Sequence, residues 1–128
     1  MVKDIKRREA MKYLAQAEEF LASARQSLES DRYNAAGFNA VQAMINANDA
    51  LTIFHLEQRA STDHREGIKL HADVAKIIND GSQRERLKEA LQLRSDAGYM
   101  GTPISKNDAE RVLRHATQFI AWTRKYVR

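Results

Sequence analysis

Hydrophobic residues recur along most of this chain at intervals of three and four positions, the period of an α-helix with one buried face. The pattern predicts helices over residues 3–29, 32–55, 66–79, 82–97 and 105–126, with "EQRASTDHREG" as the loop between the second and third. Because the connections are short, we expect consecutive helices to pack antiparallel. The predicted fold is an all-α up-and-down bundle of four long helices and one short helix, forming a single domain over residues 1–128.

Turn residues set the predicted helix ends. Asn79-Asp80-Gly81 is expected to end the third helix, and Gly98 to close the fourth in the left-handed conformation. Pro103 prevents a straight continuation into the fifth helix. Ser105, with Asp108 three residues later, resembles a capping box at the start of that last helix.

Composition narrows the class of protein. The chain has no cysteine, which excludes disulfides and thiolate metal sites and fits a cytoplasmic location. Its basic start is not followed by a continuous apolar run, and no uncharged apolar stretch is long enough to cross a bilayer, so neither a secretory signal nor a membrane segment is expected. The formal net charge of +4 permits an anionic partner such as RNA without requiring one.

Two predicted helices carry a second stripe beside the core stripe. On the second helix the stripe is polar, and it either faces water or lines a hydrogen-bonding cleft or dimer seam. It consists of Asn39, Gln42, Asn46 and Asp49. On the last helix the stripe is largely aromatic and consists of His115, Phe119, Trp122 and Tyr126. We expect Phe119, Trp122 and Tyr126 to form a dimer interface, the alternative being that the first helix covers a broad core face.

Three segments resemble HEPN domains, which are small all-helical bacterial and archaeal proteins. They are "SDRYNAAGFNAVQAMINANDAL" (30–51), "ASTDHREGIKLHADV" (60–74) and "LQLRSDAGYMGTPISKNDAERVLRHATQFI" (91–120). The resemblance implies a homodimer, and for many members a nucleotidyltransferase partner in a toxin–antitoxin pair. It also implies one of two activities. Many members are metal-independent ribonucleases with the motif Arg, four to six residues, then His. Others lack that motif and are associated with binding nucleotides or partner proteins.

Arg94 matches the arginine of the family motif, and Tyr99 stands where the histidine would be. A phenol is mostly neutral at pH 7 and is a poor base, whereas a guanidinium binds phosphate well. The leading hypothesis is therefore a non-catalytic or weakened HEPN protein that binds RNA, a nucleotide or a nucleotidyltransferase near Arg94, Tyr99 and the polar stripe. One alternative is a ribonuclease that uses Arg94 with Tyr99 or with His115. Another is a structural adaptor whose Arg94 is paired with Asp96 or Asp49.

The other histidines are assigned weaker roles. Arg59 and His64 also have the spacing Arg-x4-His, but they fall in the predicted loop, away from the family position, and we expect a chance match. Arg111 and His115 are one helical turn apart, so His115 could supply the missing imidazole from the same chain or from a second copy. His71 is expected to be a hydrogen-bonded core or edge residue. His64, His71 and Asp73 match no metal-binding signature, and no metal or cofactor is predicted.

Overall fold

The computed structural model describes residues 2–61 and 63–128. Its helices are α1 (Ala10–Glu29), α2 (Tyr33–Leu56), α3 (His64–Ile78), α4 (Arg84–Tyr99) and α5 (Lys106–Tyr126), with a 3-10 turn at Arg7–Glu9 and two strands, β1 (Val2–Asp4) and β2 (Gln58–Ala60). The predicted all-α bundle is confirmed. None of the helices in the described residues is long and apolar enough to cross a membrane.

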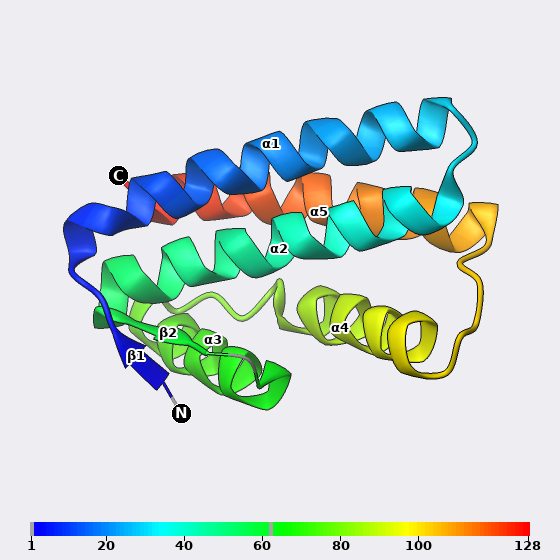
Figure 1. Ribbon diagram of the computed structural model, residues 1–128. Coiled ribbons are helices and arrows are strands. Elements are labelled where there is room, and N and C mark those ends of the chain that lie inside the picture. Colours follow the sequence, from blue (N-terminus) through cyan, green and yellow to red (C-terminus); the bar gives the residue numbers. More distant parts are fainter. Residues whose placement is uncertain (1, 62) are drawn as a thin grey trace.

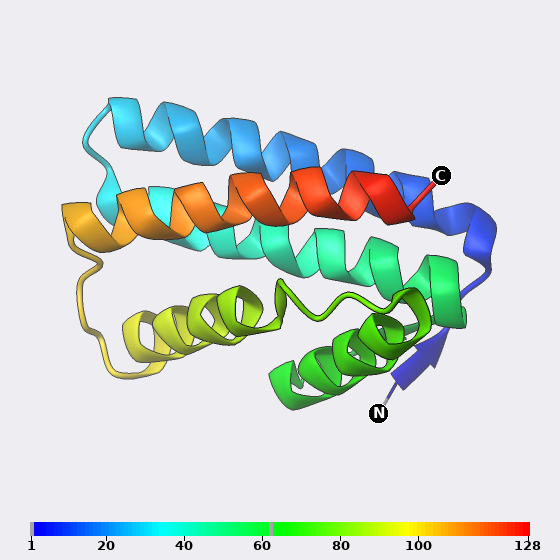
Figure 2. The same ribbon diagram turned by 180° about the vertical axis from the view of Figure 1, so that it is seen from behind.

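Helix α2 lies at the centre of the bundle. It runs beside α1 and α5, while α3 and α4 follow one another along its other side (Figure 1). The view from behind shows α5 between α1 and the α3–α4 pair (Figure 2). Many buried positions of α2 are alanines, which lets neighbouring backbones approach closely; those that are 0% exposed are Ala36, Ala40, Ala43, Ala47 and Ala50. The side of α2 facing α3 and α4 carries polar residues instead, and the candidate site lies there.

The start of the chain and the α2–α3 connection differ from the prediction. Lys3 and Asp4 were expected to begin the first helix, but residues 2–4 pair antiparallel with residues 58–60, with Lys3 opposite Arg59. The backbone N–H of Ile5 extends the pairing by donating to the Glu57 carbonyl at 2.9 Å. A three-residue strand is too short to produce a readable alternation. The pairing fixes the position of Arg59, which a free loop would not.

The segment between α4 and α5 is held against α2. Helix α4 continues past Gly98 to Tyr99, and Gly101 instead adopts the left-handed conformation (φ 68°), so the prediction for Gly98 is wrong. Ile104 is buried, and its N–H donates to the Asn34 side chain at 2.7 Å. A Cβ at Gly37 would lie only 2.5 Å from the Ile104 Cδ1, so any other residue here would require the Ile104 side chain or its backbone to shift. Gly37 therefore lets the connection dock onto the bundle.

Other predicted helix ends are confirmed. Asn79 ends α3 in the left-handed conformation (φ 55°). The hydroxyl of Ser105 accepts a hydrogen bond from the Asp108 N–H at 3.1 Å and caps α5.

The aromatic stripe of α5 packs inside the chain. Phe119 is 0% exposed and Trp122 is 6% exposed, and both rings contact the imidazole of His71 from α3, with centroids 5.7 and 5.6 Å apart. The sequence interpretation placed these rings at a dimer interface because the position of α3 could not be foreseen. Since both side chains are buried within one chain, with His71 against their rings, Phe119 and Trp122 offer almost no surface to a second copy. Tyr126, half-buried, packs against Trp122.

Asp80 joins the α3–α4 turn to the end of α5. Its carboxylate accepts hydrogen bonds from the Trp122 Nε1 at 2.8 Å and the Tyr126 hydroxyl at 2.9 Å, and also from the Ser82 N–H at 3.0 Å. These donors, with the Ser82 contacts first, hold the pKa of Asp80 well below its usual range.

The depressed pKa of Asp80 predicts acid sensitivity. A carboxylate with a lowered folded-state pKa stabilises the fold above its unfolded pKa, and this contribution is lost as the pH falls below about 4. An Asp80→Asn variant is therefore expected to show a shallower loss of urea stability between pH 5 and pH 2.5 than the wild type. Urea midpoints measured across that range test this, and equal slopes for the two proteins would contradict it.

Candidate functional site: a cleft between α2, α3 and α4

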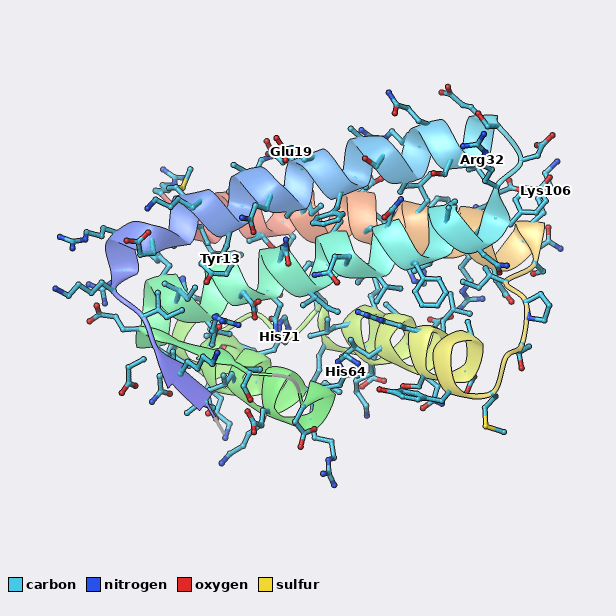
Figure 3. The ribbon with its side chains drawn as sticks, viewed as in Figure 1. Tyr13, Glu19, Arg32, His64, His71 and Lys106 are labelled. Carbon is cyan, nitrogen blue, oxygen red and sulfur yellow. The ribbon has the colours of Figure 1, made fainter. Side chains whose placement is uncertain are left out.

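One cleft of about 600 Å³ opens between α2, β2, the start of α3 and α4. We call this cavity the central cleft. Its chemically informative members are Tyr13, Phe38, Gln42, Asn46, Asn48, Asp49, Arg59, Asp63, His64, Arg94 and Tyr99. Figure 3 shows His64 at the end of α3 that faces α4, with Tyr13 on α1 and His71 further along α3. The cleft thus draws its side chains from elements that are far apart in the sequence.

Arg94 projects into the cleft from α4 and is held by neutral groups. Its Nη1 donates to the Gln42 Oε1 at 3.3 Å, and its guanidinium carbon lies 6.0 Å from the centre of the Phe38 ring. Among the described residues no carboxylate lies within 4.0 Å of this guanidinium. The expected ion pair with Asp96 or Asp49 is therefore not formed, and Asp96 accepts from Gln92 instead. Within the described part of the chain, the positive charge of Arg94 has no counter-ion.

A chain of amides runs from Arg94 along α2 to α1. Gln42 Nε2 donates to Asn46 Oδ1 at 2.9 Å, and Asn46 Nδ2 donates to the Gln16 Oε1 at 3.5 Å. Three members of the polar stripe, Gln42, Asn46 and Asp49, line the cleft, whereas Asn39 does not. The sequence left open whether the stripe faces water or lines a cleft, and for those three residues it lines a cleft. Of these, Gln42 contacts Arg94 and orients it without neutralising its charge.

Arg59 is the second cation of the cleft. It projects from β2, its Nη1 donates to the Ala60 carbonyl at 3.1 Å, and its guanidinium carbon lies 5.7 Å from the centre of the Tyr13 ring. Its Nε is buried and has no hydrogen-bond partner among the residues that the structure describes. Like Arg94, it has no carboxylate within 4.0 Å in residues 2–61 and 63–128. The sequence interpretation missed Tyr13 and Phe38, the rings beside the two arginines, because their spacing resembles that of core residues.

His64 lies in the same cleft. It is the first residue of α3 and follows the cap Asp63, whose carboxylate accepts from the Arg65 N–H at 2.8 Å. Burial lowers the pKa of His64, and the nearby charge of Arg94 lowers it further, against the opposing effect of Asp63. The imidazole is therefore mainly neutral at pH 7. Arg59 and His64 fall in the predicted loop, away from the family position, yet β2 and the start of α3 bring both to the cleft that Arg94 enters.

Asp49 is the buried acidic group of the cleft. Asp49 is only 8% exposed. Burial raises the pKa of Asp49 to about 7, although the charge of Arg59 acts in the opposite direction. Both protonation states are therefore present at neutral pH.

The remaining candidate residues lie at the rim or elsewhere. Tyr99 borders the cleft but is 84% exposed, so it lies at the rim. His115 is not brought to Arg94: it borders a separate cavity of about 270 Å³ between α4 and α5. There Glu89 pairs with Arg111 at 2.7 Å and lies 3.8 Å from the His115 Nδ1. Within one chain, His64 rather than His115 accompanies Arg94.

Comparison with known families agrees with this architecture. The family model described as the HEPN domain matches residues 10–126, which is most of the chain. The chain belongs to the HEPN family. A search of curated proteins gives no match.

Two residue pairs with the spacing of the family motif line one cleft in this HEPN domain. They are Arg94 with Tyr99 and Arg59 with His64. No group of three or more potential metal ligands occurs in the part of the chain that the structure describes. The chemistry available in the cleft is anion binding by two guanidiniums, with an imidazole and a carboxyl group for proton transfer.

Proposed function

We propose that this HEPN protein binds RNA or a nucleotide through a phosphate group in the central cleft, with Arg94 as the main phosphate ligand and Arg59 as a second cation. The observation that carries the proposal is the pairing of Arg94 with the Gln42 amide instead of with a carboxylate. A half-buried guanidinium loses hydration and is costly without a counter-ion. A bound phosphate would supply that counter-ion and match the planar donor geometry of arginine.

The same pairing argues against the structural-adaptor alternative. An arginine whose role is structural is expected to be fixed by Asp or Glu, which satisfies both its charge and its donors. Gln42 satisfies one donor and leaves the charge available. The cleft volume of about 600 Å³ is also in the range of small-ligand sites.

Binding is tested by the anisotropy of a labelled RNA oligonucleotide. Arg94→Gln is expected to weaken binding at least tenfold, because charge-assisted bonds to phosphate are lost. Wild-type affinity is expected to fall steeply with salt. Arg111→Gln is the matched control. The substitution makes the same change in net charge, and Arg111 is paired with Glu89 outside the cleft. Equal affinities for wild type and Arg94→Gln would contradict the proposal.

A second candidate, metal-independent RNA cleavage, is favoured by the position of His64. A neutral imidazole beside Arg94 could accept the proton of a ribose 2′-hydroxyl. The 2′-oxygen would then form a bond to phosphorus as the bond to the 5′-oxygen breaks, and the leaving 5′-oxygen would take a proton from solvent. The guanidinium of Arg94 would stabilise the charge on the phosphorus-bound oxygens.

Cleavage is separable from binding. Concentrated wild-type protein is incubated with mixed RNA in EDTA beside His64→Gln and Arg94→Gln. Under the cleavage candidate, both variants lose the cyclic-phosphate product that the wild type forms, and His64→Gln still binds RNA. Intact RNA after incubation with the wild type would end this candidate and leave the binding function in place.

A further inference from the structure

Asp49 has an unpaired carboxyl group in the wall of the central cleft. The residue is 8% exposed, and its carboxyl oxygens accept no hydrogen bond from any described residue; the Thr52 hydroxyl bonds to its main-chain oxygen instead, at 3.3 Å. A largely buried carboxyl group that accepts no hydrogen bond from the protein is poorly solvated, and a donor on a ligand would stabilise it. Because Asp49 lines the cleft, a bound ligand is in a position to do so.

The placement of Asp49 on α2 sets its distance from the phosphate-binding end. Gln42, which holds Arg94, and Asp49 share the cleft face of α2, and seven residues of helix separate them by about 10 Å along the axis. The cleft therefore has the guanidinium of Arg94 at one end and the hydrogen-bond-accepting carboxyl group of Asp49, on which the charge of Arg59 acts, at the other. The rings of Tyr13 and Phe38 line the cleft as well.

We infer that Asp49 is a specificity-determining contact that accepts a hydrogen bond from the amino group of a nucleotide base while the phosphate of the same nucleotide lies at Arg94. This inference rests on the proposed phosphate-binding function. A nucleoside monophosphate carries its phosphate and its base on opposite sides of the sugar, which matches the order of the two ends. Carboxylates accept hydrogen bonds from exocyclic base amino groups in nucleic-acid recognition.

The protonation of Asp49 makes the strength of this contact depend on pH. The ionised carboxylate is the stronger acceptor, and the pKa of Asp49 is raised to about 7 by burial, so the contact strengthens as the pH rises from 6 to 8. Other titratable or charged groups of the cleft affect any bound phosphate monoester alike; they are Tyr13 from α1, Arg59 from β2, Asp63 before α3, His64 from α3, and Arg94 and Tyr99 from α4. The ratio of affinities for two monoesters therefore isolates Asp49.

The test is calorimetric titration of adenosine 5′-monophosphate and ribose 5-phosphate into wild type, Asp49→Asn and Arg94→Gln. Asp49→Asn is expected to lower the affinity for adenosine monophosphate about fivefold to tenfold, which is the difference between a charged and a neutral acceptor. The affinity for ribose 5-phosphate is expected to change less than about twofold. The wild-type ratio of the two affinities rises from pH 6 to pH 8, and the Asp49→Asn ratio stays constant. Arg94→Gln weakens both ligands.

The failures are distinguishable. Suppose that Arg94→Gln lowers the affinity for both ligands, while Asp49→Asn lowers the two affinities equally or lowers neither. The inference is then overturned and the phosphate-binding function stands. Wild-type protein that binds RNA but not adenosine monophosphate likewise overturns the inference alone. Wild-type protein that binds none of the three ligands overturns the proposed function and the inference together.

Discussion

Replacing Phe119 with alanine is expected to lower the free energy of unfolding by about 3–5 kcal/mol, the usual cost of removing a large buried aromatic side chain. The ring is 0% exposed and lies against His71 and Trp122, with centroids 5.7 and 5.8 Å away. Truncation would leave a cavity at the junction of α3 and α5. Urea denaturation followed by far-ultraviolet circular dichroism measures the loss, and Gln118→Ala, at the exposed neighbouring position of α5, is the control with little expected change.

The Phe119 variant also separates a core role from an interface role. If the ring served a dimer, its removal would shift the association state in sedimentation velocity and change the unfolding energy of the chain little. The structure leads us to expect the opposite result. A stable Phe119→Ala protein with altered association would contradict the packing of α3 on α5. Homodimerisation itself stays a prediction, and it would have to use another surface.

Replacing Gln42 with glutamate is expected to weaken RNA binding at least tenfold while leaving the fold intact. Gln42 Oε1 lies 3.3 Å from the Arg94 Nη1, so a carboxylate at this position would form an ion pair with Arg94 and repel phosphate. Glutamate has nearly the shape and the helix propensity of glutamine, so α2 should tolerate the change. The anisotropy titration used for Arg94→Gln measures the effect.

Gln16→Glu provides the matched control for this variant. Gln16 is the exposed far end of the same amide chain, on α1, and the substitution makes the same change in net charge. We expect near wild-type affinity, because the new charge lies away from Arg94 and is screened by solvent. Equal losses for Gln16→Glu and Gln42→Glu would show that net charge, and not the local partner of Arg94, controls binding.

Much of the fold could be predicted because helical periodicity is a local property. The five helices follow from the spacing of apolar residues, and Asn79 and Ser105 end and begin helices as their chemistry predicts. The β1–β2 pairing could not be predicted, since it joins residues more than fifty positions apart through strands of three residues each. Local patterns also could not decide between Gly98 and Gly101 as the left-handed residue.

The candidate site was predictable only in part, for a related reason. The stripe on α2 shows that Gln42, Asn46 and Asp49 share a face, and the helical register of α4 turns Arg94 inward. Which histidine approaches Arg94 depends on how the helices pack. His115 has a favourable one-turn spacing from Arg111 but lies on the far side of α4, whereas His64 reaches the cleft through the β2 connection. The spacing of Arg59 and His64 was the available signal.

Gly37 has a consequence for access to the cleft, although it borders no part of it. Because position 37 carries no side chain, Ile104 can insert against α2, and Ile104 anchors the chain a few residues after Tyr99, at the rim. A methyl group at position 37 would lie 2.5 Å from the Ile104 Cδ1, so the Ile104 side chain would have to turn or the segment that it anchors would have to move. If the segment moves, the rim beside Tyr99 moves with it, and the rates of ligand entry and exit then depend on a residue outside the cleft.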